Sequence, residues 1–264
     1  MKKAIILSAI ISLINVPALK AQKLPNVQET SLRAPVNVKV DGKATEWNNG
    51  FQAYNRATEI YYTVSNDNNN LYLTIQTTDI DISNKIICSG VTFMINGSGK
   101  MKDQGGIAIT FPALKRDQFG GVGQPDGRLS SSLPPIDYRK ETVAMNEQLN
   151  SIARDIKVTG IKGIQDSISL YNSEGIKAAG LFNEDKVFTC EMSLPLKYLK
   201  LQENEKSLIY SIKIDGPLIR NLTRRNLTSL RVVNGVDIME GPDAPRIQSL
   251  IATTDFWGEY TLAK

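Results

Sequence analysis

Short runs in which apolar and polar side chains alternate are the feature that most constrains the fold of this chain. In the range 71–77, Leu71, Leu73 and Ile75 fall on one side of an extended segment, and the range 36–40 alternates in the same way. A period of two residues is typical of a β-strand that buries one face. Further strand signals occupy 60–64, 91–95, 107–111, 166–171, 175–182, 186–193, 207–214 and 257–263. Short strands separated by turn residues predict an all-β fold, an antiparallel β-sandwich.

One segment has a helical period instead. Met145, Leu149, Ile152 and Ile156 recur at intervals of four, three and four residues, which places them on a single stripe of a helix. We therefore predict one peripheral helix near 141–154. Its apolar stripe is expected to pack against the outside of the sandwich.

The N-terminal segment 1–21 has the pattern of a secretory signal peptide. Two lysines precede an apolar run over 4–14, and small residues lead up to Ala21. The run is shorter than the roughly 20 residues of a membrane-spanning helix. We expect cleavage after Ala21, with Ala18 as the alternative, export to the periplasm or the extracellular space, and no membrane span. The mature chain, 22–264, is expected to form a single domain.

Composition excludes several classes of function. The chain contains no histidine, which excludes Ser-His-Asp and Cys-His catalysis and histidine-ligated zinc. Most of the net charge of +4 belongs to the leader, because its three lysines leave 28 basic and 27 acidic residues in the mature chain. A nearly neutral domain lacks the basic footprint of a nucleic-acid-binding protein. We expect no nucleic-acid partner, no metal, no cofactor and no enzymatic activity. We expect Cys88 and Cys190 to be buried free thiols, with a disulfide between them as the alternative.

Five segments, taken in chain order, resemble family 9 carbohydrate-binding modules. The stretch 38–47 is similar to the "IDG…W" opening of that family, and Leu71-Tyr72-Leu73 followed by Asp79 is similar to its "LYV…D" strand. The stretches 90–96, 188–199 and 256–258 resemble the "VEIFID" strand, the "yElaIPl..L" segment and the closing "FG…L" piece. Between the matching segments, 97–175 looks like an insertion.

This resemblance implies the β-sandwich that these modules share with DOMON domains, which bind sugars or haem. In the sugar-binding members two tryptophans clamp the sugar, and the corresponding positions here hold Ile86 and lie near Ile251. Aliphatic side chains can offer apolar contact but no π-face to a sugar. Trp47 and Trp257 match positions that are structural in the family, so we expect both to pack rather than to bind.

Because the clamp is missing, the glycine- and proline-rich segment 112–139 becomes the predicted recognition loop. We expect Tyr138 to serve as an aromatic platform, with Arg116, Asp126 and Arg128 as hydrogen-bonding groups. The predicted function is that of an exported, non-catalytic module that binds a polysaccharide or oligosaccharide.

Four alternatives remain open. The same loops suit an envelope protein partner. Haem would need methionine or lysine ligands in a chain without histidine, and Met94 is expected to be core packing. Calcium could bind to oxygen ligands at Asp79–Asp81 or at Asn66–Asn70. Neither segment has the ligand spacing of an EF-hand loop, so we expect both to be turns. A glycoside hydrolase needs a carboxylate pair that the sequence does not single out.

Overall fold

The structure is a computed structural model, and it describes residues 23–48, 50–96, 105–114, 138–199, 201, 207–216, 230–233, 236–239, 242 and 244–264. The predicted signal peptide and most of the predicted recognition loop lie outside these ranges. Within them, no helix is long and apolar enough to cross a membrane.

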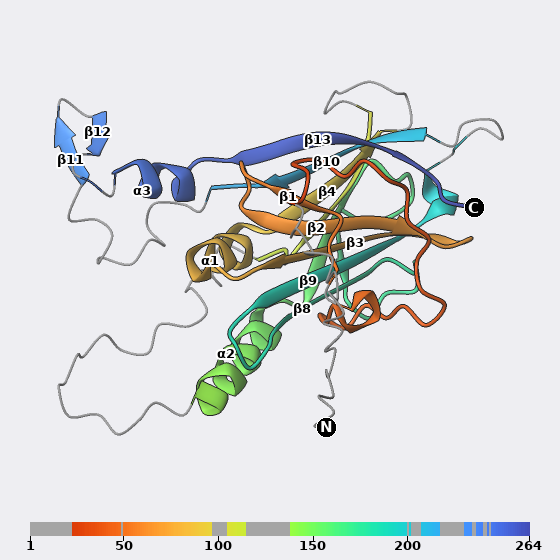
Figure 1. Cartoon of the computed structure of the whole chain (residues 1–264), viewed down its shortest axis with the longest axis horizontal. Coiled ribbons are helices and arrows are strands. Elements are labelled where there is room, and N and C mark those ends of the chain that lie inside the picture. Colours follow the sequence, from red (N-terminus) through yellow and green to blue (C-terminus); the bar gives the residue numbers. More distant parts are fainter. Residues whose placement is uncertain are drawn as a thin grey trace, which may run out of the picture.

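Two antiparallel sheets form the body of the protein, which confirms the predicted sandwich (Figure 1). The five-stranded sheet has the order β1 (Ala53–Asn55), β2 (Ile60–Asn66), β3 (Asn70–Thr77), β9 (Phe188–Pro195) and β8 (Lys177–Phe182). The six-stranded sheet has the order β13 (Thr254–Thr261), β10 (Ser207–Ile214), β4 (Val91–Asn96), β5 (Ile107–Phe111), β6 (Asp155–Thr159) and β7 (Ser167–Ser169). Strands β5, β6 and β7 fall within the range 97–175, which therefore supplies three strands of this sheet. A separate hairpin joins β11 (Leu230–Val233) to β12 (Val236–Met239).

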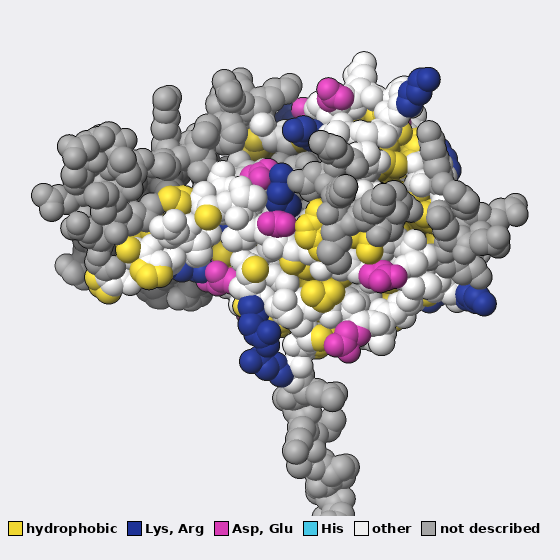
Figure 2. Space-filling model, turned by 90° about the horizontal axis from the view of Figure 1, so that it is seen from above, with side chains coloured by type: hydrophobic (Ala, Val, Ile, Leu, Met, Phe, Trp, Pro, Cys, Tyr) yellow, Lys and Arg dark blue, Asp and Glu magenta, His cyan; other side chains and the backbone are white. Residues whose placement is uncertain are grey.

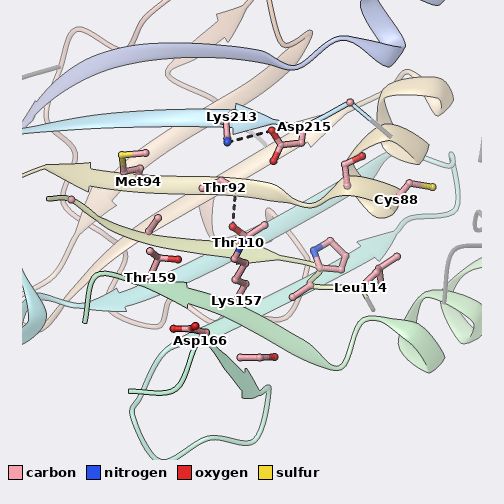
Figure 3. Close-up of a pocket in the computed structure, with 17 residues that line it drawn as sticks. Cys88, Thr92, Met94, Thr110, Leu114, Lys157, Thr159, Asp166, Lys213 and Asp215 are labelled. Carbon is pink, nitrogen blue, oxygen red and sulfur yellow. Dashed lines mark hydrogen bonds and ion pairs between the residues drawn. The ribbon is translucent and has the colours of Figure 1, made fainter. Parts of the chain in front are cut away.

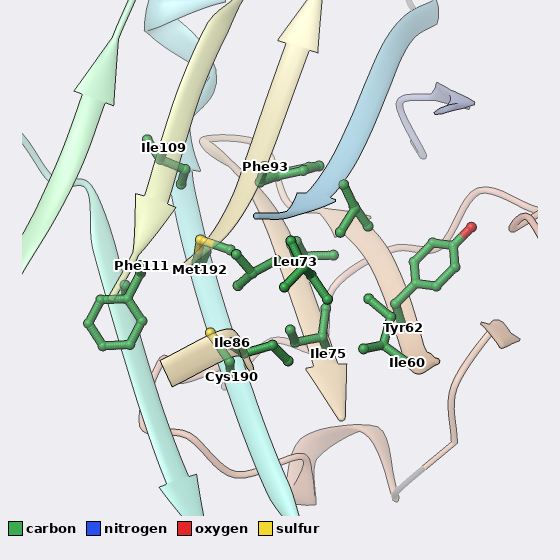
Figure 4. Close-up of a cluster of buried hydrophobic side chains, with 14 of the residues drawn as sticks. Ile60, Tyr62, Leu73, Ile75, Ile86, Phe93, Ile109, Phe111, Cys190 and Met192 are labelled. Carbon is green, nitrogen blue, oxygen red and sulfur yellow. The ribbon is translucent and has the colours of Figure 1, made fainter. Parts of the chain in front are cut away.

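The core lies between the two sheets, and the pleat decides which side chains enter it. Leu73 and Ile75 point inward from β3, and Phe93 points inward from β4, all without exposed surface (Figure 4). Tyr62 of β2 and Tyr210 of β10 meet across the core, with their hydroxyl oxygens 3.0 Å apart. Because both hydroxyls are buried, this hydrogen bond satisfies groups that would otherwise destabilise the core.

Helix α2 (Tyr138–Ile152) confirms the predicted peripheral helix. Met145 and Leu149 are buried against the core, as expected from their spacing. The Asn146 amide also exchanges two hydrogen bonds of 2.8 Å with the backbone of Phe182, which fixes the helix beside β8.

Two further helices were not predicted. Helix α1 (Ile80–Ser89) begins after Asp79, whose carboxylate accepts hydrogen bonds from the amides of Asp81 and Ile82. The expected turn at Asp79–Asp81 is therefore wrong, because Asp79 is a helix N-cap. Helix α3 (Ala244–Ile251) leads into β13. Short 3-10 turns lie at Thr45–Trp47 and Leu196–Tyr198.

Polar contacts of two cationic side chains hold α3 against α1. The Lys85 ammonium donates to the Ser249 carbonyl at 2.9 Å and to the Thr254 hydroxyl at 3.0 Å. Burial lowers the pKa of Lys85 to about 8. The Arg246 guanidinium bridges Glu59 and Asp79. These contacts fix the point at which β13 enters the six-stranded sheet.

The predicted strand over 36–40 is wrong. This segment has no strand partner and lies over the outer face of the five-stranded sheet, where Val38 and Val40 pack beside Trp47 and Tyr72. The buried Trp47 agrees with its expected packing role. Alternating apolar residues also suit an extended segment that lies across a sheet, so the pattern alone could not separate the two structures.

Glu191 attaches this covering segment to the sheet. One carboxylate oxygen of Glu191 accepts hydrogen bonds of 3.0 Å from the amides of Asp41 and Gly42. Gly42 has a φ of +80°, and a Cβ there would lie 2.8 Å from the Cβ of Leu181. The chain bends at Asp41-Gly42, and glycine is required there. Burial raises the pKa of Glu191 to about 7, although the two amides partly oppose the shift.

The variant Glu191→Gln tests this link. A raised pKa in the folded state means that the free energy of unfolding falls as pH rises from about 4.5 to about 7, by up to roughly 3 kcal/mol. Glutamine accepts the same amide hydrogen bonds without ionising. Urea unfolding at pH 5 and pH 8 should show this loss in the wild type and not in the variant. Equal pH dependence in both proteins would contradict the assignment.

Candidate ligand groove on the six-stranded sheet

A groove of about 700 Å³ lies on the outer face of the six-stranded sheet (Figure 3). Its floor follows directly from the pleat. Val91, Phe93 and Ile95 of β4 face the core, so Thr92 and Met94 project from the opposite face into the groove. The outward residues of β5, β6 and β10 continue the floor on either side.

A continuous polar row crosses this floor. The strand register places Lys213, Thr92, Thr110, Lys157 and Ser167 side by side on five neighbouring strands. The Thr92 and Thr110 hydroxyl oxygens are 2.8 Å apart and share one hydrogen bond. A hydroxyl can donate one bond and accept others, so both threonines retain capacity for a ligand.

Of the two lysines in the row, one forms an ion pair within the described part of the chain and the other does not. The Lys213 ammonium lies 3.3 Å from a carboxylate oxygen of Asp215, and both side chains are partly exposed. Lys157 is exposed, and among the described residues no hydrogen bond or ion pair engages its ammonium. Figure 3 shows its side chain directed toward Thr110, its register partner. Asp166 contributes an exposed carboxylate at the far margin.

A second row beside the polar one has an apolar centre and ends at Thr159 of β6. Met94 and Ala108 are register partners here, and Pro112, Ala113 and Leu114 close one end of the groove. The expectation that Met94 is core packing is wrong, because the residues that alternate with it form the core. The described lining contains no aromatic side chain.

The C-terminal end of α1 shapes the end of the groove that is closed by Pro112, Ala113 and Leu114. Gly90 has a φ of +78°, and a Cβ there would lie 2.6 Å from the methyl group of Thr110 and 2.7 Å from the carbonyl oxygen of Pro112. Only glycine allows the chain to pass from α1 into β4 so close to β5. Cys88 and Ser89 line the groove beside it. Cys88 and Cys190 are both buried free thiols, so the disulfide alternative is not formed.

A second hollow, of about 850 Å³, lies on the outer face of the five-stranded sheet, beside the covering segment. Several of its polar side chains are already engaged in internal hydrogen bonds. The Tyr72 hydroxyl donates to Asp67 at 2.7 Å, and the Asn68 side chain accepts a hydrogen bond from Arg33. The groove on the six-stranded sheet is therefore the better candidate for a ligand.

The predicted site residues remain predictions. Arg116, Asp126 and Arg128 lie outside the described residues, and so does the side chain of Tyr138, the first residue of α2. The described beginning of the predicted loop, 112–114, does line the groove. Ile86 has no exposed surface and packs in the core, so it offers a ligand no apolar contact.

No protein-family model and no curated protein matches the sequence. The resemblance to family 9 carbohydrate-binding modules therefore depends on the sequence motifs alone. Within the described ranges, no group of three or more cysteine, aspartate or glutamate side chains could hold a metal ion. On the face shown in Figure 2, acidic and basic side chains lie scattered among neutral ones, without a large area of one charge.

The groove lysines should be dispensable for folding. Lys157 is exposed, and Lys213 forms a partly exposed ion pair, a type of contact that contributes little to stability. We expect Lys157→Met and Lys213→Met each to change the free energy of unfolding by less than about 1 kcal/mol. Urea unfolding measures this directly. A loss above about 2 kcal/mol would indicate a structural role for the lysine concerned.

Proposed function

We propose that this protein is a non-catalytic carbohydrate-binding module, and that the groove on the six-stranded sheet is its binding site. The observation that carries the proposal is the polar row beside an apolar row on one open sheet face. Export after cleavage of the segment 1–21 is part of the same proposal.

The chemistry of the polar row suits a polyol. Each sugar hydroxyl both donates and accepts hydrogen bonds. Lys157 offers only donors, Asp166 offers only acceptors when ionised, and Thr92 and Thr110 offer both. A ligand with many hydroxyls can satisfy all of these groups, whereas a ligand of one charge would leave either Lys157 or Asp166 unmatched.

The apolar row supplies the other half of the recognition surface. A sugar ring presents C–H groups between its hydroxyls, and Met94 and Ala108 lie two residues along the strands from Thr92 and Thr110, on the same face of the sheet. The thioether of methionine is polarisable and adapts to irregular surfaces. Contact with these side chains would remove apolar area from water on both partners.

The carboxylates of the groove support binding without hydrolysis. Asp215 follows β10 and Asp166 precedes β7, so four strand spacings, about 19 Å, separate their backbones across the sheet. Figure 3 shows them on opposite sides of the groove. Glycosidases that use two carboxylates hold them about 5–10 Å apart.

A glycan array followed by calorimetry tests the proposal. We expect Lys157→Met and Thr110→Val to weaken binding of the selected glycan about ten-fold each, because each removes a hydrogen bond to the ligand. Lys177→Met is the matched control, since Lys177 is an exposed lysine on the other sheet. Undiminished binding by the groove variants would reject this site. A blank array with an envelope protein recovered by pull-down would favour the protein-interaction alternative.

Met94 provides the one observation that favours haem as a second candidate. Its thioether projects into the groove instead of the core, and thioether sulfur is a known axial ligand of haem iron. Under the carbohydrate proposal, purified protein should be colourless and should show no intense visible absorption after incubation with haemin. A new absorption band that Met94→Leu abolishes would establish the haem alternative.

A further inference from the structure

Trp257 lies on the same outer sheet face as the groove. In β13, Phe256 and Tyr260 belong to the core, and Phe256 packs 4.9 Å from Tyr62 between ring centroids. Between them, a Cβ on Gly258 would lie 2.3 Å from the Tyr210 ring, so Gly258 also faces inward. Because strand residues alternate, Trp257 projects outward.

The register continues the apolar row of the groove to Trp257. Trp257 pairs with Ser211, Ser211 pairs with Met94, and Met94 pairs with Ala108. Two strand spacings, about 10 Å, therefore separate the backbones of Trp257 and Met94. Ser211, which lies between them, has a small side chain and is 3% exposed.

The two tryptophans of the chain have different environments. Trp47 is 8% exposed within the cluster under the covering segment, and its indole N–H is buried without a hydrogen-bond partner. Trp257 is half-buried and belongs to neither core cluster of the described residues. Its indole nitrogen is not among the buried unpartnered atoms. The expected packing role fits Trp47, whereas Trp257 is more exposed than Trp47.

We infer that Trp257 is an aromatic platform that extends the groove across β10 to β13, and that the ligand is an oligosaccharide chain lying across the strands. The inference depends on the proposed carbohydrate-binding function. The groove itself has no aromatic side chain in its described lining, while sugar C–H groups pack well on an indole face. A single sugar bound over β4 and β5 does not also cover Trp257, because β13 lies two strand spacings, about 10 Å, from β4. Longer chains should therefore bind more tightly than single sugars.

Calorimetry with glucose and cellotetraose, xylose and xylotetraose, and mannose and mannotetraose tests this extension. We expect Trp257→Ala to weaken binding of the preferred tetrasaccharide about ten-fold and to change binding of the matching monosaccharide less than about two-fold. Trp257→Phe keeps an aromatic face and should recover most of the affinity. Thermal unfolding of both variants checks that the fold is retained.

Tryptophan fluorescence gives an independent readout. The chain has two tryptophans, so Trp257→Phe leaves Trp47 as the sole emitter. The tetrasaccharide should change the emission of the wild type and leave that of Trp257→Phe unchanged. Equal tetrasaccharide affinity in the wild type and Trp257→Ala would overturn the extension while the groove proposal stands. Failure of all six sugars to bind would overturn both.

Discussion

The pleat of the six-stranded sheet is the constraint on which both the core and the groove depend. A strand cannot bury Phe93 without turning Thr92 and Met94 to the opposite face, and it cannot bury Phe256 and Tyr260 without turning Trp257 outward. A shift of one residue in register would exchange the two faces completely. The aromatic contacts of Tyr210 with Phe93 and Phe256 hold β4, β10 and β13 in the observed register. The polar row is thus the outer side of the same arrangement that fills the core.

Buried charged side chains stabilise the fold, whereas the charged side chains at the groove are exposed and available to a ligand. Glu191 and Lys85 are buried, and their polar atoms are engaged by backbone amides, a carbonyl and hydroxyls. Removing such a partner leaves a buried charge unsatisfied, which is costly. Lys157 and Asp166 are exposed at the groove and have no comparable structural partner among the described residues. Their substitution should affect a ligand more than it affects the fold.

Much of the fold could be predicted from the sequence, because strand alternation and helix period are local signals. The ranges 71–77, 91–95, 107–111 and 207–214 and the stripe of Met145 and Leu149 all appear as expected. Helix α1 was missed because its isoleucines resemble a strand, although Asp79 is a recognisable N-cap. Helix α3 was not predicted, although Pro245 in its first turn is a start signal.

The groove could not be predicted from the sequence, because it depends on strand order. Lys213, Thr92, Thr110 and Lys157 are far apart in the chain and become neighbours only when β10, β4, β5 and β6 pair. The most direct test of this account is the change in backbone amide NMR shifts on addition of the preferred tetrasaccharide. The account predicts shifts at Thr92, Met94, Thr110, Lys157 and Trp257, with Gln76 and Thr189 on the outer face of the other sheet unaffected. Shifts confined to the five-stranded sheet, or none at saturation, would contradict it.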